Sequence, residues 1–154
     1  MKSLLKRYTM GFDLWGLLLF AIIMLPNLIW MAHPAPNDVL RAESVTPVVD
    51  IIGSICQMAM IFCLCFIRRV DARPLRLSPM VVAALVCVLV YLAAWGCYYA
   101  GITNQLILLL LTLVPCAAFL LYLADRQNGI GLIPAALFTL CHVIFAIVNF
   151  LIVS

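Results

Sequence analysis

The chain has 154 residues, of which 68% are hydrophobic and only 10% are charged, and its formal net charge is +3. Soluble globular proteins carry about half apolar residues and about a quarter charged ones. The composition therefore excludes a water-soluble enzyme or binding module, and intrinsic disorder with it. The small net charge argues against a nucleic-acid partner. We expect an integral membrane protein in contact with the lipid bilayer, and the length allows about five spans of about 20 residues each.

Five long apolar runs without Lys or Arg follow one another along the chain: residues 12–31, 48–67, 80–100, 105–123 and 130–153. In a bilayer the backbone polar groups must be satisfied within each segment, so each run predicts an α-helix. The runs do not alternate apolar and polar residues as barrel strands do. We therefore predict an all-α fold, a transmembrane bundle of five spans that forms one domain over residues 1–154.

Short polar signals mark the ends of these helices. Residues 46–47 (Thr-Pro) and 78–79 (Ser-Pro) are each typical of an N-cap followed by the first helical residue. Residues 101–104 and 125–129 form tight connections. Tight connections predict that the helices they join are antiparallel neighbours.

The basic residues indicate an orientation. Only Arg41 would lie on one side of a five-span chain, and the other eight would share the opposite side: Lys2, Lys6, Arg7, Arg68, Arg69, Arg73, Arg76 and Arg126. Because loops rich in Lys and Arg stay in the cytoplasm, we predict a cytoplasmic N-terminus and an external C-terminus. The first apolar run is longer than the hydrophobic part of a signal peptide, and Trp30 is a poor residue beside a cleavage site. We interpret this run as an uncleaved span.

All seven cysteines lie inside the apolar runs, and none forms a CxxC pair or a Cys/His cluster with zinc spacing. We interpret them as packing residues. The sequence also lacks HExxH, GxSxG, Walker and GxGxxG motifs. No catalytic residue, metal ion or cofactor is therefore predicted.

Polar residues inside the apolar runs are costly in lipid, which makes them candidates for function. Asp50, Ser54 and Gln57 share one face of the second helix, and we expect that face to point into the bundle. His142 and Asn149 share one face of the fifth helix. If the two helices are neighbours, these five residues form a ligand-binding path open to the outside, with Asp50 and Asn149 at its mouth, where the acidic group favours cations or amines. Interhelical hydrogen bonds that only stabilise packing are the alternative.

The external segment 32–45 is the longest loop. His33, Asp38 and Glu43 could hold a metal ion there, but they lack a recognisable ligand spacing. We expect an ordinary surface loop with a short helix over residues 38–44.

The third helix has two distinct faces. The aromatic face consists of Tyr91, Trp95 and Tyr98, and the small-residue face of Ala93, Cys97 and Gly101. We expect the aromatic face to be a core or lipid-facing stripe and the small-residue face to pack closely on a neighbour. At the edge of the first helix, Asp13 is expected in the solvated interface.

Two stretches carry a resemblance: residues 8–16 (Tyr-Thr-Met-Gly-Phe-Asp-Leu-Trp-Gly) and residues 36–47 (Pro-Asn-Asp-Val-Leu-Arg-Ala-Glu-Ser-Val-Thr-Pro). They look like stretches of small bacterial integral membrane proteins with five spans, and the resemblance runs over most of the chain. It implies a bacterial inner membrane and no activity. Length and span number are also similar to the tryptophan-rich sensory protein family. That family's Trp- and Pro-rich first loop is not matched, so none of its ligand residues are carried over.

Three functions are consistent with these patterns. The first is a multi-pass protein of the cell membrane that binds or passes a small or lipophilic ligand through an outward-facing cavity. The second is a non-catalytic subunit that packs against another membrane protein or a second copy of itself. The third is a membrane enzyme that uses Asp50 and His142 for acid–base chemistry.

Overall fold

The computed structural model describes residues 7–72 and 74–152. Five helices in this part of the chain are long and apolar enough to cross a bilayer. They are α2 (Leu14–Ala32), α3 (Pro47–Phe66), α4 (Pro79–Tyr99), α5 (Gln105–Asp125) and α6 (Gly129–Ala146), which continues as the π-helical stretch η2 (Ile147–Ile152). Each begins and ends within two residues of the apolar run that predicted it. The five-helix architecture is therefore confirmed.

Side-chain caps explain where four of these helices begin. The caps of α2, α4, α5 and α6 accept hydrogen bonds from backbone N–H groups of the first turn, and they are Asp13, Ser78, Asn104 and Asn128. At the start of α3, Thr46 occupies the N-cap position but caps nothing with its side chain. Its hydroxyl instead donates to Asp50 Oδ1 at 3.3 Å, which matters for the site described below.

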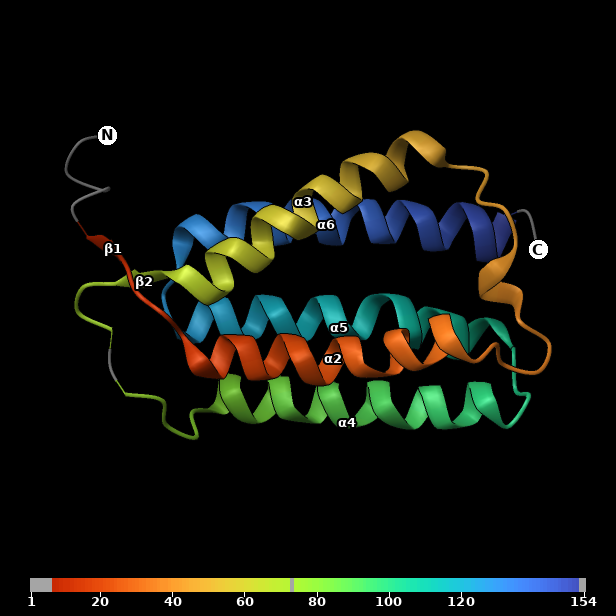
Figure 1. The fold of residues 1–154 in the computed structure, drawn as a ribbon, viewed down its shortest axis with the longest axis horizontal. Helices are drawn as coiled ribbons and strands as arrows, with labels where there is room; N and C mark the ends of the chain where they lie inside the picture. The colour runs from red at the N-terminus through yellow and green to blue at the C-terminus, as the bar shows by residue number, and fades with distance from the viewer. Residues whose placement is uncertain (1–6, 73, 153–154) are drawn as a thin grey trace.

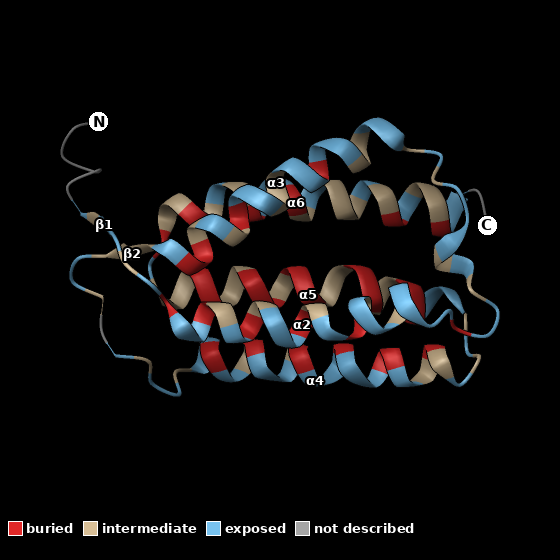
Figure 2. Ribbon diagram, viewed as in Figure 1, coloured by how far each residue is buried: buried red, intermediate tan, exposed pale blue. Residues whose placement is uncertain are grey.

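Helix α5 lies at the centre of the arrangement (Figure 1). It packs against α4 and α6, α3 packs along α6, and α2 lies against α4 and α5. Half of the most apolar stretch of α5 is buried, against a third or less in the other four helices (Figure 2). Helix α2 also approaches α3 closely, because a Cβ on Gly16 would lie 2.6 Å from the Leu64 carbonyl oxygen. Only glycine permits that contact.

The helices alternate in direction, so their connections gather at two ends of the bundle. The sheet end consists of β1 (Tyr8–Met10), β2 (Ile67–Arg69), residues 70–72 and 74–78, and the turn at 126–128. The loop end consists of residues 33–46 with the 3₁₀ turn η1 (Val39–Arg41), the turn at 100–104 and η2. The two ends lie at opposite sides of Figure 1.

The two short strands at the sheet end were not predicted. They pair antiparallel, with Tyr8 opposite Arg69 and Met10 opposite Ile67. Ile67 was expected to end the second helix, but there the chain leaves the helix for the strand. A strand of three residues is too short to show a period-2 pattern in the sequence.

The core between α2, α4 and α5 is rich in aromatic side chains. Tyr91, Trp95 and Tyr98 are only 2%, 5% and 0% exposed. The Trp95 ring lies 6.4 Å from the Trp30 ring and 5.6 Å from the Tyr98 ring, measured between centroids. The aromatic face of α4 is therefore core, one of the two environments predicted for it.

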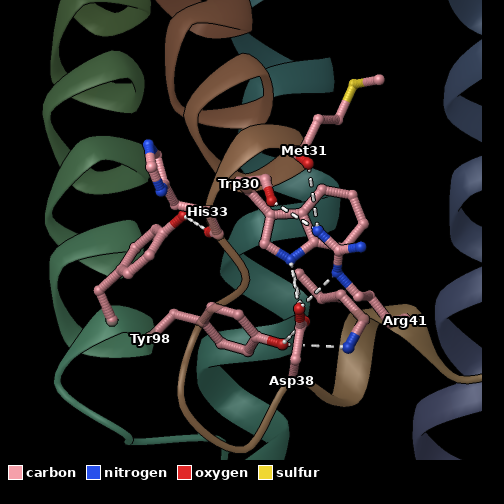
Figure 3. A network of polar contacts seen from close by, with 8 residues as sticks. Trp30, Met31, His33, Asp38, Arg41 and Tyr98 are labelled. Atoms are coloured by element: carbon pink, nitrogen blue, oxygen red, sulfur yellow. Dashed lines mark hydrogen bonds and ion pairs between the residues drawn. The ribbon is translucent and has the colours of Figure 1, made fainter.

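A hydrogen-bond network holds the loop end against this core (Figure 3). Asp38 accepts hydrogen bonds from Trp30 Nε1 at 2.9 Å, Tyr98 Oη at 2.8 Å and Arg41 Nε at 2.8 Å. Burial opposes ionisation of Asp38, but these hydrogen bonds and the charge of Arg41 outweigh it, so the pKa of Asp38 lies below its ordinary value. The carboxylate therefore ties the loop to α2 and α4.

This network also changes the interpretation of the loop. The short helix expected over residues 38–44 is only the single turn η1. Of the residues considered for a metal ion, Asp38 is engaged by Trp30 and Tyr98. Over residues 7–72 and 74–152, no three His, Cys, Asp or Glu side chains gather as a metal site.

Candidate ligand-binding groove

A groove between α3 and α6, near the loop end, brings together four of the five predicted site residues. It encloses about 200 Å³ and is lined from α3 by Val49, Asp50, Gly53, Ser54 and Gln57, and from α6 by Phe138, Cys141, His142 and Phe145. The groove exists because α3 and α6 pack along each other. The predicted path requires the second and fifth helices to be neighbours, and in the structure they are.

Residue spacing and one glycine explain how the groove forms. Asp50, Gly53 and Gln57 fall on one side of α3 at helical spacing. A Cβ on Gly53 would lie 3.3 Å from the Cys141 Cβ. The absence of a side chain there lets the two backbones approach closely, and the longer side chains on either side of Gly53 then line the space that remains.

Asp50 is held in place by a chain of hydrogen bonds. Thr46 Oγ1 donates to Asp50 Oδ1 at 3.3 Å, and Asn149 Nδ2 donates to Thr46 Oγ1 at 3.1 Å. The Val45 backbone N–H donates to Asn149 Oδ1 at 3.0 Å. The Thr-Pro pair at residues 46–47 predicts a helix cap, whereas in the structure Thr46 orients Asp50.

Asn149 therefore acts beside the groove and does not line it. An α-helix that continued to residue 149 would put Asn149 on the face of His142. From Ile147 onward the backbone is π-helical, and a π-helical turn contains more residues than an α-helical one. Asn149 lies in this stretch and reaches the level of Asp50 through Thr46.

His142 lies half-buried on the opposite wall. Its Nδ1 is 3.3 Å from the Phe138 carbonyl oxygen, and its ring centroid is 4.0 Å from that of Phe138. Within the described residues, no hydrogen bond or ion pair joins His142 to Asp50. The two ionisable groups share the groove without a direct contact.

The expectation that the polar face of α3 points into the bundle is wrong for Ser54. Ser54 is exposed, and its hydroxyl donates back to the Asp50 carbonyl oxygen at 2.8 Å. Gln57 is half-buried, and its amide makes no hydrogen bond to the part of the chain that is described. On this side α3 packs chiefly on α6, so its polar face lies at the boundary between two helices. The groove is consequently open to the surroundings of the bundle.

Asp13 lies in a different environment from the solvated interface expected for it. It is 7% exposed, caps α2, accepts a hydrogen bond from Tyr122 Oη at 2.9 Å and pairs with Arg126 Nε at 3.5 Å. Its burial depends on partners more than 100 residues away in sequence. The signal available in the sequence was its N-cap position before residues 14–16.

The small-residue face of α4 does not pack as a whole within this chain. Ala93 is exposed, and Cys97 and Gly101 are half-buried. A Cβ placed on the neighbouring Gly96 would meet nothing within 4 Å. Any close packing of this face would therefore need a second protein.

Comparison with models of known protein families, with curated proteins and with solved structures finds no match.

Proposed function

We propose that the chain is a multi-pass membrane protein with its sheet end in the cytoplasm and its loop end outside. The five apolar helices support this, and so does the distribution of arginines. Arg41 lies at the loop end, whereas the sheet end carries Arg7, Arg68, Arg69, Arg76 and Arg126. Lys2, Lys6 and Arg73, which also entered the prediction, lie outside the described residues. Because Lys and Arg are enriched on the cytoplasmic side of short loops, the sheet end faces the cytoplasm.

A reporter fusion tests this orientation. A reporter fused after Ser154 is expected to be active outside the cell, and one inserted within residues 70–78 only inside. A cytoplasmic C-terminus would contradict the five-span assignment.

We propose that the groove between α3 and α6 binds the cationic head group of a small amphiphilic ligand, such as an alkylamine. The observation that carries the proposal is that Asp50, Gln57 and His142, from two helices, line one cavity that is open to the surroundings of the bundle. An ionisable group kept within a span is costly and tends to serve a ligand or ion. Here the Asp50 carboxylate, oriented by Thr46, is the group that attracts a cation.

Size and length of the groove favour binding over passage. Drug-sized ligands occupy pockets of about 300–1,000 Å³, so a cavity of about 200 Å³ accommodates a head group whose tail stays in lipid. Its lining on α3 runs from Val49 to Gln57, which is about 12 Å at 1.5 Å per residue. That is well short of the hydrocarbon thickness of about 30 Å.

Binding of a probe to the reconstituted protein tests this proposal. We expect a fluorescent long-chain alkylammonium to bind the full chain in phosphatidylcholine nanodiscs, and the alcohol of equal length to bind weakly. Asp50→Asn should weaken the amine by about tenfold, the effect of losing one charge-assisted contact. Asp71→Asn is the matched control, because Asp71 is exposed at the sheet end. Equal affinity of both variants would contradict the groove as the site.

The second candidate is a non-catalytic subunit that packs against another membrane protein or a second copy of this chain. It rests on the exposed small-residue face of α4, where Ala93 and Gly96 would let another helix approach closely. Cross-linking through a cysteine placed at Ala93 tests this candidate, and a cysteine placed at Ile133 on α6 is the control. If the chain packs through α4, only the cysteine at position 93 should form a specific adduct. The enzyme interpretation has less support because Asp50 and His142 make no contact in the described structure.

A further inference from the structure

Two adjoining hollows lie at the sheet end, far from the groove between α3 and α6. The larger, of about 600 Å³, is lined by Arg69, Arg76 and Ser78 among others. The smaller, of about 350 Å³, is lined by Trp15 and Arg68 among others. The two hollows share Pro74 and Arg126. Neither belongs to the candidate site described above.

Some of the charged side chains on the walls of the hollows form ion pairs, and others do not. Four arginines and three aspartates contribute: Arg68, Arg69, Arg76, Arg126, Asp13, Asp71 and Asp125. Asp13 pairs with Arg126, Asp71 pairs with Arg69, and Asp125 accepts a hydrogen bond from Ser78. Over residues 7–72 and 74–152, no carboxylate forms an ion pair with Arg68 or Arg76. Arg68 Nη1 donates to the Phe12 carbonyl oxygen at 3.4 Å, which leaves the other N–H groups of Arg68 in the smaller hollow, and Arg76 in the larger one, available to an anion.

Apolar side chains surround these arginines. Phe12, Leu14 and Trp15 are exposed beside Arg68 in the smaller hollow. Met80 is exposed in the wall of the larger hollow. Trp at a helix end is typical of the boundary between hydrocarbon and head groups. A guanidinium next to exposed apolar and indole side chains suits a molecule with an anionic head and an apolar tail.

We propose that these hollows bind the phosphate-bearing head group of an anionic phospholipid from the cytoplasmic leaflet, with Arg68 and Arg76 contacting phosphate oxygens. The planar guanidinium matches phosphate geometry with two parallel hydrogen bonds. Basic pockets on the cytoplasmic side of a helical membrane protein are where such head groups bind. The inference rests on the membrane orientation proposed above and does not depend on the groove between α3 and α6.

Native mass spectrometry of the full chain, released from nanodiscs that contain equal amounts of phosphatidylglycerol and phosphatidylcholine, tests the proposal. We expect phosphatidylglycerol to be retained in preference to phosphatidylcholine. Arg68→Gln and Arg76→Gln together should lower that retention about tenfold or more, since each removes a charge-assisted contact. Arg7→Gln is the matched control, because it removes one positive charge from the sheet end outside both hollows, and it should change retention less than twofold.

Three results would overturn the proposal. They are equal retention of the two lipids, an equal loss of phosphatidylglycerol retention in the Arg7→Gln control, and displacement of phosphatidylglycerol by millimolar inorganic phosphate, which would make free phosphate the ligand.

Arg76 is exposed, so Arg76→Gln alone carries the test if the double variant fails to fold. Asp50→Asn should leave phosphatidylglycerol retention unchanged, and the arginine variants should leave alkylammonium binding unchanged. Failure of one proposal is therefore distinguishable from failure of the other.

Discussion

The aromatic core between α2, α4 and α5 and the groove between α3 and α6 both carry polar side chains within apolar helices, but they use them differently. In the core, Tyr98 donates to Asp38, and Asn27 donates to both the Ile23 carbonyl oxygen and Tyr91. In the groove, Gln57 and His142 line one cavity from facing helices. Within the described residues, no hydrogen bond joins them. Polar groups that are satisfied within the protein stabilise packing, whereas those left facing a cavity are available to a ligand.

The comparison is tested most strongly at Trp95. Trp95→Ala should lower the free energy of unfolding by about 3 kcal/mol, because it leaves a cavity among packed rings. Phe145→Ala on the wall of the groove should cost less, since that side chain is only partly buried and one side of it lines the groove. Unfolding by sodium dodecyl sulfate in mixed micelles measures both. Equal losses would remove the distinction between the two regions.

Asp13 extends the comparison to the sheet end. Asp13→Asn should lower the free energy of unfolding by about 2 kcal/mol, because Arg126 would keep its charge in a site where only 10% of its side chain is exposed. Asp71→Asn removes an exposed ion pair and should change stability by less than about 0.5 kcal/mol. The same unfolding assay checks the pair, and a small effect of Asp13→Asn would show that the buried contact contributes nothing.

Acidification tests the network at the loop end. The folded-state pKa of Asp38 is lower than its ordinary value, so the stability it contributes is complete above the unfolded pKa of about 3.9 and is lost as pH falls through the folded value. The Leu40 amide donates to Tyr98 Oη at 3.0 Å. We expect the protection of this amide, measured as its exchange rate relative to the intrinsic rate at the same pH, to fall below about pH 4. Asp38→Asn should abolish this pH dependence, and a wild-type profile that persists in the variant would exclude Asp38 as its source.

The smallest effect is expected at Gln57. Gln57→Leu should change the free energy of unfolding by less than about 0.5 kcal/mol, because the amide makes no hydrogen bond to the described part of the chain. Affinity for the alkylammonium probe should still fall. A loss of stability above about 1 kcal/mol would instead assign Gln57 to packing.

The sequence predicts the features that depend on residues close together along the chain, and not those that depend on residues far apart. The five long helices follow from apolar content alone, because each apolar run has about the length that a bilayer-crossing helix needs. Asp50, Ser54 and Gln57 share a face because helix geometry is local. Whether that face meets the bundle interior depends on which helices pack against α3, and no local pattern records this, so Ser54 was placed wrongly.

Two further differences from the expectation have the same origin. Asn149 lies in the π-helical stretch η2, bonds to Thr46 and is not part of the groove lining, and nothing in the apolar run over residues 130–153 marks the change from α-helix to π-helix. Asp13 was expected in water because its buried partners, Tyr122 and Arg126, belong to the far end of α5 and the turn after it. Interactions between residues so distant become visible only once the chain is folded.

The contact between Asp13 and Tyr122, which lie 109 residues apart in sequence, has a consequence for synthesis of the protein. Helix α2 leaves the ribosome first, yet the groups that neutralise and hydrogen-bond its capping carboxylate leave only with the end of α5. Until then the Asp13 carboxylate must find its hydrogen-bond partners outside the chain. The sheet end is accordingly completed late in biogenesis, after four of the five helices have been made.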